Sequence, residues 1–426
     1  MSTVTARHSP AIERSRKEAL AFWKVPIAFA IFAAAALVLF ILLGRDGVST
    51  FGFAQSDDAF AIPPIPVPVR ATGIVVTILL AGLTAYSAVL VRQAKRVPVW
   101  LVIVFALVFM VAFLAWGSAG HTLPFTSLLI GTVSLSVPLI FGALGGVIGE
   151  RAGVVNIAIE GQLLGGAFVA ALVASSTGQP LLGLIAAMVA GMLVAFVLAA
   201  FSINYFVDQI IVGVVLNVLV LGLTNFLYSQ VMVSHPELNA GLRLSPIAIP
   251  GLSGIPIIGP ILFRQTIIVY LMYIAVAAVY FGLFHTRWGL RLRSVGEHPQ
   301  AADTVGIDVT GTRFWNVSLA GAIVGLGGAF FTLGSVGRFT EDMTGGQGYI
   351  ALAAVIFGRW DPIKATLAAL LFGFATNLQN ILGVIGSPVP SQFMLMLPYV
   401  VTIFAVAGLV GQSRPPAADG KPYIKS

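Results

Sequence analysis

Residues 97–116 read VPVWLVIVFALVFMVAFLAW, a continuous apolar run without a single charged side chain. A helix rises about 1.5 Å per residue, so this run is long enough to cross the roughly 30 Å hydrocarbon core of a bilayer. The whole chain shares the bias, because 58% of its 426 residues are hydrophobic and only 9% are charged. Soluble domains carry about 25% charged residues. The sequence therefore predicts an all-α, polytopic integral membrane protein.

Further apolar runs predict eleven or twelve transmembrane segments in total. One of them, 349–358, covers only about 15 Å as a helix and is too short to cross alone. It follows the segment from Thr344 to Gly348, TGGQG, which favours unwound backbone of the kind tolerated at membrane depth only inside protein or beside a cavity. The predicted full-length spans are 25–43, 71–91, 97–116, 127–147, 157–175, 182–203, 210–228, 266–285, 317–336, 365–382 and 393–411.

The basic residues predict the orientation of these spans, because cytoplasmic loops retain lysine and arginine. With the N-terminus inside, 18 of the 23 basic residues fall in cytoplasmic segments. This count requires that 349–358 takes the chain across, since Arg359 and Lys364 would otherwise lie outside. We therefore expect a multi-pass inner (plasma) membrane protein with both termini in the cytoplasm. The net charge of +7 then reflects topology, and no nucleic-acid partner is expected.

The predicted organisation has four parts, divided by changes in hydropathy. Those parts are a cytoplasmic tail, 1–24; three additional N-terminal helices, 25–116, with a proline-rich outside loop, 44–70; a core, 117–411, with a long inside loop, 286–316; and a polar tail, 412–426. We expect the last of these, a cytoplasmic tail, to be disordered.

The composition argues against several kinds of chemistry. The chain has no cysteine and its five histidines form no H-x-x-x-H pair, so no metal site and no cofactor are expected. No phosphate-binding G-x-x-x-x-G-K-[ST] motif occurs. Energy for transport would therefore come from another subunit or an ion gradient. Glu160 is the one firm ionisable residue inside a predicted span, and this scarcity disfavours both an ion-coupled carrier and a membrane-embedded enzyme.

Polar residues near the unwound segment predict a solute path, although a structural reading stays open. Asn156 lies four residues before Glu160, so the two side chains share a helix face. They line the path or a gate, or they act as an N-cap and a first-turn acid, and both roles can hold together. Neutral amides such as Asn217 also interrupt apolar spans, and three gather in 377–380, where not all can face lipid. The candidate path residues are Asn156, Glu160, Gln162, Gly345, Gly346, Gln347, Gly348, Asn377 and Asn380. Glycine pairs such as Gly321 and Gly325 predict close helix packing.

Two stretches carry a family resemblance. Residues 142–162 read GALGGVIGERAGVVNIAIEGQ, and residues 289–307 read GLRLRSVGEHPQAADTVGI, with LAGAIVGLGGA following at 319–329. Together they resemble the permease subunits of the branched-chain amino acid, ribose and nucleoside class of ATP-binding-cassette (ABC) importers. The E-R-x-G-V-x-N-I-x-x-E-G-Q form resembles the nucleoside branch most. The resemblance extends from near residue 120 to 411.

This resemblance implies a non-enzymatic transport subunit that forms the path for a nucleoside or similar small polar solute. It also implies three partners: a cytosolic ATPase of two fused halves, a second homologous permease and a substrate-binding lipoprotein. The inside loop would couple the permease to the ATPase through Arg293, Gly296, Glu297, His298, Pro299, Ala301 and Ala302. A ribose- or galactose-type sugar permease and a secondary carrier remain the alternatives.

Overall fold

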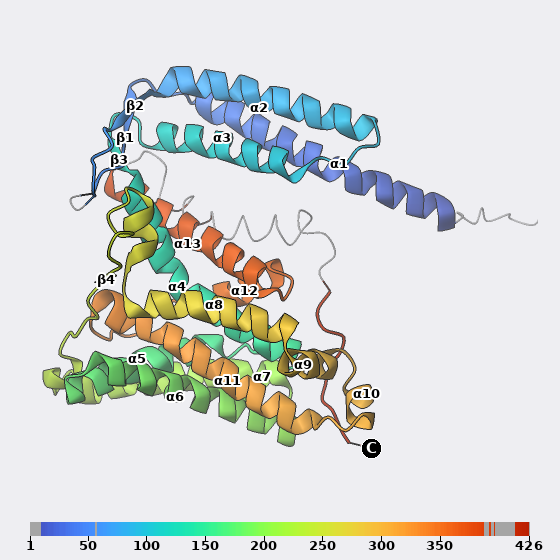
Figure 1. Cartoon of the computed structure of the whole chain (residues 1–426), viewed down its shortest axis with the longest axis vertical. Helices are drawn as coiled ribbons and strands as arrows, with labels where there is room; N and C mark the ends of the chain where they lie inside the picture. Colours follow the sequence, from blue (N-terminus) through green and yellow to red (C-terminus); the bar gives the residue numbers. More distant parts are fainter. Residues whose placement is uncertain (1–9, 56–57, 387–391, 393–395, 397–413, 426) are drawn as a thin grey trace, which may run out of the picture.

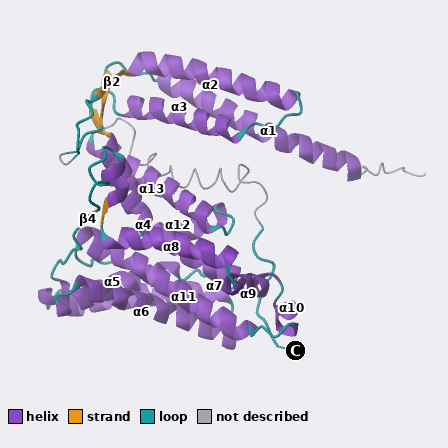
Figure 2. Cartoon of the chain, viewed as in Figure 1, coloured by secondary structure: helices purple, strands orange, loops and turns teal. Residues whose placement is uncertain are grey.

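The structure, a computed structural model, describes residues 10–55, 58–386, 392, 396 and 414–425. Helices dominate this part of the chain, and the short strands gather toward one end of the helices (Figures 1 and 2). Ten helices in the described residues are long and apolar enough to cross a membrane. This confirms the predicted all-α polytopic class. The predicted span 393–411 lies outside the described residues.

The N-terminal helices form a layer of their own, seen at the top of Figure 1. Its packing is aromatic: the rings of Phe29 and Phe105 stack with centroids 4.0 Å apart. The elements are α1 (Pro10–Ala36), a π-helical continuation (Leu37–Leu42), β1 (Val48–Gly52), β2 (Ile65–Pro68), α2 (Val69–Arg92), α3 (Val99–Gly117) and β3 (Thr122–Pro124). In the sheet, β1 lies between an antiparallel β2 and a parallel β3. The proline-rich segment thus supplies an edge strand, where a missing N–H is tolerated.

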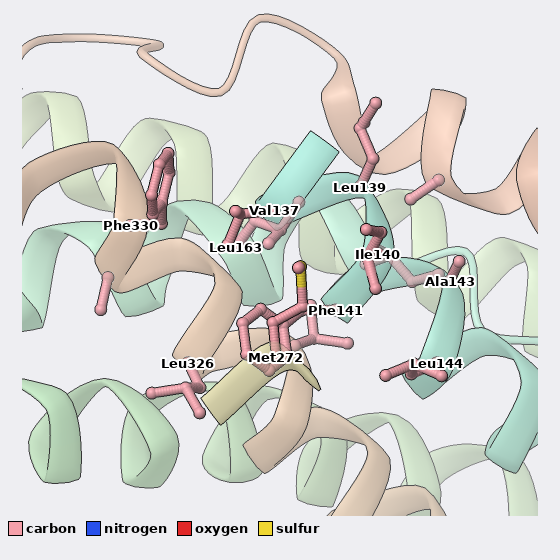
Figure 3. Packing of buried hydrophobic residues seen from close by; sticks show 14 of the residues in the cluster. Val137, Leu139, Ile140, Phe141, Ala143, Leu144, Leu163, Met272, Leu326 and Phe330 are labelled. Atoms are coloured by element: carbon pink, nitrogen blue, oxygen red, sulfur yellow. The ribbon is translucent and has the colours of Figure 1, made fainter. Parts of the chain in front are cut away.

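The remaining long helices pack around α4 and α11, the two most buried spans. Figure 3 shows side chains of α4, among them Phe141 and Val137, gathered with Leu163 of α5 and Leu326 of α11. The helices are α4 (Phe125–Arg151), α5 (Ile159–Thr177), α6 (Pro180–Ala199), α7 (Gln209–Leu227), α8 (Ile267–His285), α11 (Val309–Ala329) and α13 (Pro362–Val384). The connecting elements are short: Ala200–Asn204, Tyr228–Met232, Pro236–Asn239, β4 (Ile247–Ala248), Gly259–Phe263, β5 (Arg264–Gln265) and Phe330–Val336.

Small residues allow α6 and α11 to touch backbone to backbone. A Cβ added at Gly325 would lie 2.2 Å from the carbonyl oxygen of Ala187, and one at Gly321 would lie 2.2 Å from Cβ of Ala195. Only glycine fits at such distances. The predicted packing role of Gly321 and Gly325 is therefore confirmed, as expected where lipid provides no hydrophobic drive between helices.

The predicted break before the short helix is also confirmed. Helix α12 (Gln347–Phe357) is preceded by turns, and both Gly345 and Gly346 adopt positive φ angles, +51° and +82°. The long loop after α8 folds into α9 (Arg287–Glu297) and α10 (Pro299–Thr304). Residues 414–425 lie against these two helices, at the end of the molecule marked C in Figure 1. The expected disorder of the tail is thus wrong for this segment.

Candidate functional site: a capped half-helix and a docking face

The first turn of α5 meets the start of α12 at a buried carboxylate. Oε1 of Glu160 accepts hydrogen bonds from Oγ1 of Thr344 at 2.6 Å and from the backbone N–H of Gly346 at 2.8 Å. Oε2 accepts a third from the N–H of Gly348. The first N–H groups of a helix lack intrahelical partners and carry partial positive charge, so an anion there is stabilising. Glu160 therefore holds the N-terminus of α12 in place.

The neighbouring Asn156 does not play the predicted capping role. It precedes the N-cap, Ala158, and is not helical, so neither a shared helix face with Glu160 nor an N-cap function exists. Its amide instead exchanges two hydrogen bonds with Gln162, at 3.1 and 3.2 Å, and both side chains are fully buried. Glu160 does lie in the first turn of α5, but its carboxylate serves α12 rather than its own helix.

A cavity of about 240 Å³ opens beside this junction. Ligand sites commonly occupy about 300–1,000 Å³, so this cavity suits a small solute or one part of a larger site. Of the predicted path residues, Glu160 and Gly346 line it, whereas Gly345, Gln347 and Gly348 adjoin it in the chain. The full lining is Glu160, Leu164, Asn217, Val218, Leu221, Asp342, Gly346 and Tyr349.

Asn217 also lines the cavity, although the sequence did not predict it as a site residue. Its Oδ1 accepts from the N–H of Gly161 at 2.8 Å, and its Nδ2 donates to the carbonyl of Ile157 at 2.8 Å and to the hydroxyl of Tyr349 at 3.1 Å. The available signal was one amide in the middle of the apolar α7. Nothing in the sequence, however, pointed to its contact with α12.

The predicted amides on α13 lie elsewhere. Nδ2 of Asn377 donates to the carbonyl of Leu128 on α4 at 2.7 Å. Gly131 makes room for this amide, since a Cβ there would lie 2.4 Å from Nδ2. Asn380 is exposed. The structure therefore does not bring Asn377 and Asn380 to the cavity beside Glu160.

The second candidate surface is formed by α9 and α10. Thr286 caps α9 by accepting from the N–H of Gly289 at 3.2 Å, and the indole of Trp288 donates to Asn316 of α11 at 2.8 Å. Gly296 sits directly on the end of α4, where a Cβ would lie 2.1 Å from the carbonyl oxygen of Arg151. These contacts fix α9 rigidly to the helices that cross the membrane.

The predicted coupling residues divide by direction. Some of them face the rest of the protein and pack against it. Arg293, for example, places its guanidinium over the ring of Phe284, 5.2 Å from the centroid. Gly296, Pro299 and Ala302 are buried, whereas Glu297, His298 and Ala301 are exposed.

Asp419 in the C-terminal tail has a shifted pKa. Burial raises the pKa of Asp419 to about 7 from an ordinary value of 3.8. A hydrogen bond from the backbone of Gly420 and the positive charge of Arg313 oppose that shift. An exposed aspartate would stay ionised well below this pH, so the shift reports how closely the tail is packed.

Comparisons with known proteins agree with this architecture. A family described as "Branched-chain amino acid transport system / permease component" matches residues 128–406. The guanosine ABC transporter permease protein NupQ of Bacillus subtilis (strain 168) is 43% identical over 307 residues, or 69% of this chain and 95% of that protein.

Two further relatives lie at decreasing similarity. The nucleoside ABC transporter permease protein NupC of Lactococcus lactis subsp. cremoris (strain MG1363) is 42% identical over 300 residues, or 68% of this chain and 94% of that protein. The putative glucose ABC transporter permease protein TsgC13 of Haloferax volcanii is 36% identical over 256 residues, or 59% of this chain and 76% of that protein. No solved structure matches the chain significantly.

Proposed function

Because this chain belongs to the permease family of branched-chain amino acid transport systems, we propose that it forms the membrane path of an ABC importer for nucleosides. The observation that carries the solute class is the identity of 43% and 42% to a guanosine and a nucleoside permease protein, over nearly their whole lengths. The path is the cavity at the junction of α5, α7 and α12. ATP hydrolysis belongs to a separate subunit.

The chemistry of the cavity suits a neutral, hydroxyl-rich solute. Both oxygens of Glu160 already accept hydrogen bonds from the start of α12, so the carboxylate acts mainly as a brace. Both N–H groups of Asn217 are already donated to Ile157 and Tyr349, so the groups that remain for a solute are the second lone pair of its Oδ1 and the hydroxyl proton of Tyr349. They offer one acceptor and one donor, as base edges and ribose hydroxyls require. The exposed carboxylate of Asp342 adds one acceptor for hydroxyl groups. Few and weak contacts also let a solute leave again, which transport demands.

A second permease is proposed to close the path along α7. The cavity lies beside Val218, whose side chain is 67% exposed, and the same helix exposes Ile211 and Phe226. An apolar face that borders a polar cavity fits a protein neighbour better than lipid, since lipid would leave the polar lining unsatisfied. The partner is a homologous permease, and a substrate-binding lipoprotein delivers the solute from outside.

The orientation follows from the basic residues, and it places the face of α9 and α10 in the cytoplasm, where the ATPase docks. The chain has no cysteine, so single cysteines can report the side. Gln300→Cys on α10 should resist a membrane-impermeant thiol reagent in intact cells, whereas Glu237→Cys in the loop after α7 should react. Labelling of Gln300→Cys in intact cells would reverse the orientation and remove the ATPase from this face.

The solute class is tested by uptake. A strain that lacks this chain should lose ATP-dependent uptake of labelled guanosine and uridine and regain it with the wild-type gene. The similarity to TsgC13 makes sugar the second candidate, so labelled glucose and ribose serve as the matched comparison. Restored uptake of a sugar without a nucleoside would replace the proposed solute. Uptake that persists when ATP is depleted would indicate a secondary carrier.

A further inference from the structure

We propose that residues 414–425 form part of the surface on which the ATPase docks, serving as a strut that holds α9 and α10 and adds one apolar contact. This inference rests on the proposed function. The family match ends at residue 406, so the family comparison assigns nothing to the tail. What supports the role is how the described tail is attached.

The first anchor is backbone pairing with α9. The N–H of Ala418 donates to the carbonyl of Gly296 at 2.9 Å, and the N–H of Ala417 donates to the carboxylate of Glu297 at 3.2 Å. Ala418 is buried, 6% exposed, in a slot bordered by Gly153. Gly153 has a φ of +87°, and a Cβ there would lie 3.2 Å from the carbonyl oxygen of Ala418. Glycine at position 153 therefore leaves room for the backbone of the tail in this slot.

The second anchor is a buried cation. Arg313, at the start of α11, is 2% exposed, and its Nη1 donates to the carbonyl of Lys421 at 2.8 Å. Its Nη2 donates to the carbonyl of Ala418 at 3.5 Å. Undocking the tail would remove both carbonyl acceptors from a buried arginine, which is costly. Permanent docking explains this arrangement better than a detachable cover does.

The third anchor is Tyr423, and the residue that follows it, Ile424, stays exposed. Tyr423 packs on Val295, Ala302 and Val309, and the ammonium of Lys425 lies 3.8 Å from the carboxylate of Asp303. Between them, Ile424 is 71% exposed, and Val305 at the end of α10 is 74% exposed. Neither residue belongs to a candidate span, so lipid does not account for their exposure. Exposed aliphatic side chains beside an ion pair fit an apolar groove on a protein partner.

The position of the tail also indicates which partner. It engages Gly296 and Glu297 from one side and leaves His298, Gln300 and Ala301 exposed. The tail therefore widens the face that the proposed function gives to the ATPase, rather than covering it. Ile424 is the contact that it adds.

A cross-link distinguishes a tail that stays docked during transport from one that must leave. The pair Asp303→Cys and Lys425→Cys introduces the only thiols in the chain, at the position of the ion pair. A reducible bifunctional thiol cross-linker, whose spacer replaces the reach of the lysine side chain, should join them in the reconstituted complex in proteoliposomes and leave ATP-driven uptake unchanged. Uptake that is lost on cross-linking and regained on reduction would overturn the proposal, because the tail would then have to leave during transport.

A substitution tests the apolar contact. Ile424→Asp should weaken ATPase binding to the intact complex by about tenfold, as expected for the loss of one buried aliphatic anchor. Leu252→Asp, an exposed apolar position in the loop between α7 and α8, is the matched control and should bind normally. Unchanged ATPase binding and uptake in Ile424→Asp would overturn this inference alone. If the unmodified chain bound no ATPase, the proposed function would fail, and this inference with it.

Discussion

Oγ1 of Thr344 donates a hydrogen bond of 2.6 Å to the carboxylate of Glu160, which lies 184 residues earlier in the chain. The same carboxylate receives two backbone N–H groups from the start of α12. A helix that begins in a buried position has no water to satisfy its first N–H groups, so a side chain from a neighbouring helix must do so. Glu160 makes a short helix possible beside a cavity.

Removing this cap should destabilise the protein and impair transport together. Glu160→Ala would leave the three donors that it accepts from without partners, at an expected cost of about 1–3 kcal/mol, more if the site stays dry. Thr344→Val removes only one of them and should have a smaller effect. Thermal unfolding in detergent and uptake assays should rank wild type above Thr344→Val above Glu160→Ala. Equal melting temperatures for all three would contradict the bracing role.

The cavity beside Glu160 should be sensitive to bulk. Val218→Trp adds an indole at a lining position on α7 and should block uptake while expression stays normal. Leu193→Trp, at a comparably exposed site on α6 outside the lining, is the control, at 60% against 67% exposed. Gly346 is a poorer test position because its φ of +82° strains any side chain. Full uptake by Val218→Trp would place the path elsewhere.

The contact between α6 and α11 should tolerate no added side chain. Gly325→Val would drive methyl groups into the carbonyl of Ala187, and the expected loss is about 1–3 kcal/mol or failure to assemble. Gly82→Ala on α2 is the matched control, since no atom lies within 4 Å of its added Cβ. Alanine is also the better helix former, so this control should melt at the same temperature or slightly higher. A Gly325→Val protein as stable as wild type would refute the close contact.

Docking of the tail should depend on pH through Asp419. Its pKa is about 7 in the docked tail and near 3.8 when free, so docking takes up a proton between these values. Docking is thus most favourable below about pH 4 and weakens as pH rises toward 7, by at most about 1.4 kcal/mol per unit. The charged groups that act on Asp419 are Glu150 of α4 and Arg313 of α11.

In urea chosen to release part of the tail, a spin label at Pro422→Cys would follow this weakening through its mobility, because the strut stays docked in native buffer. In that urea the label should become more mobile between pH 5.5 and 7.5, and little further change should follow at higher pH. Asp419→Asn removes the titrating group and should flatten the profile. A steep pH dependence that survives in Asp419→Asn would assign the titration to another group.

The sequence alone determined the membrane class, the places of the described spans and the break before α12. These depend on local properties: runs of apolar residues, and glycines at 345 and 346 that permit positive φ angles. The family motifs likewise lie in continuous stretches. The resemblance therefore pointed to the right class of permease before any contact was known.

Tertiary structure decided which polar groups meet. Sequence spacing suggested that Asn156 and Glu160 act together, but the fold pairs Asn156 with Gln162 and gives Glu160 to a helix nearly two hundred residues away. Composition suggested a disordered tail, but the buried Arg313 holds its backbone. The reason is physical: a buried polar group must find a partner in three dimensions, and that partner depends on which helices pack together, not on distance along the chain.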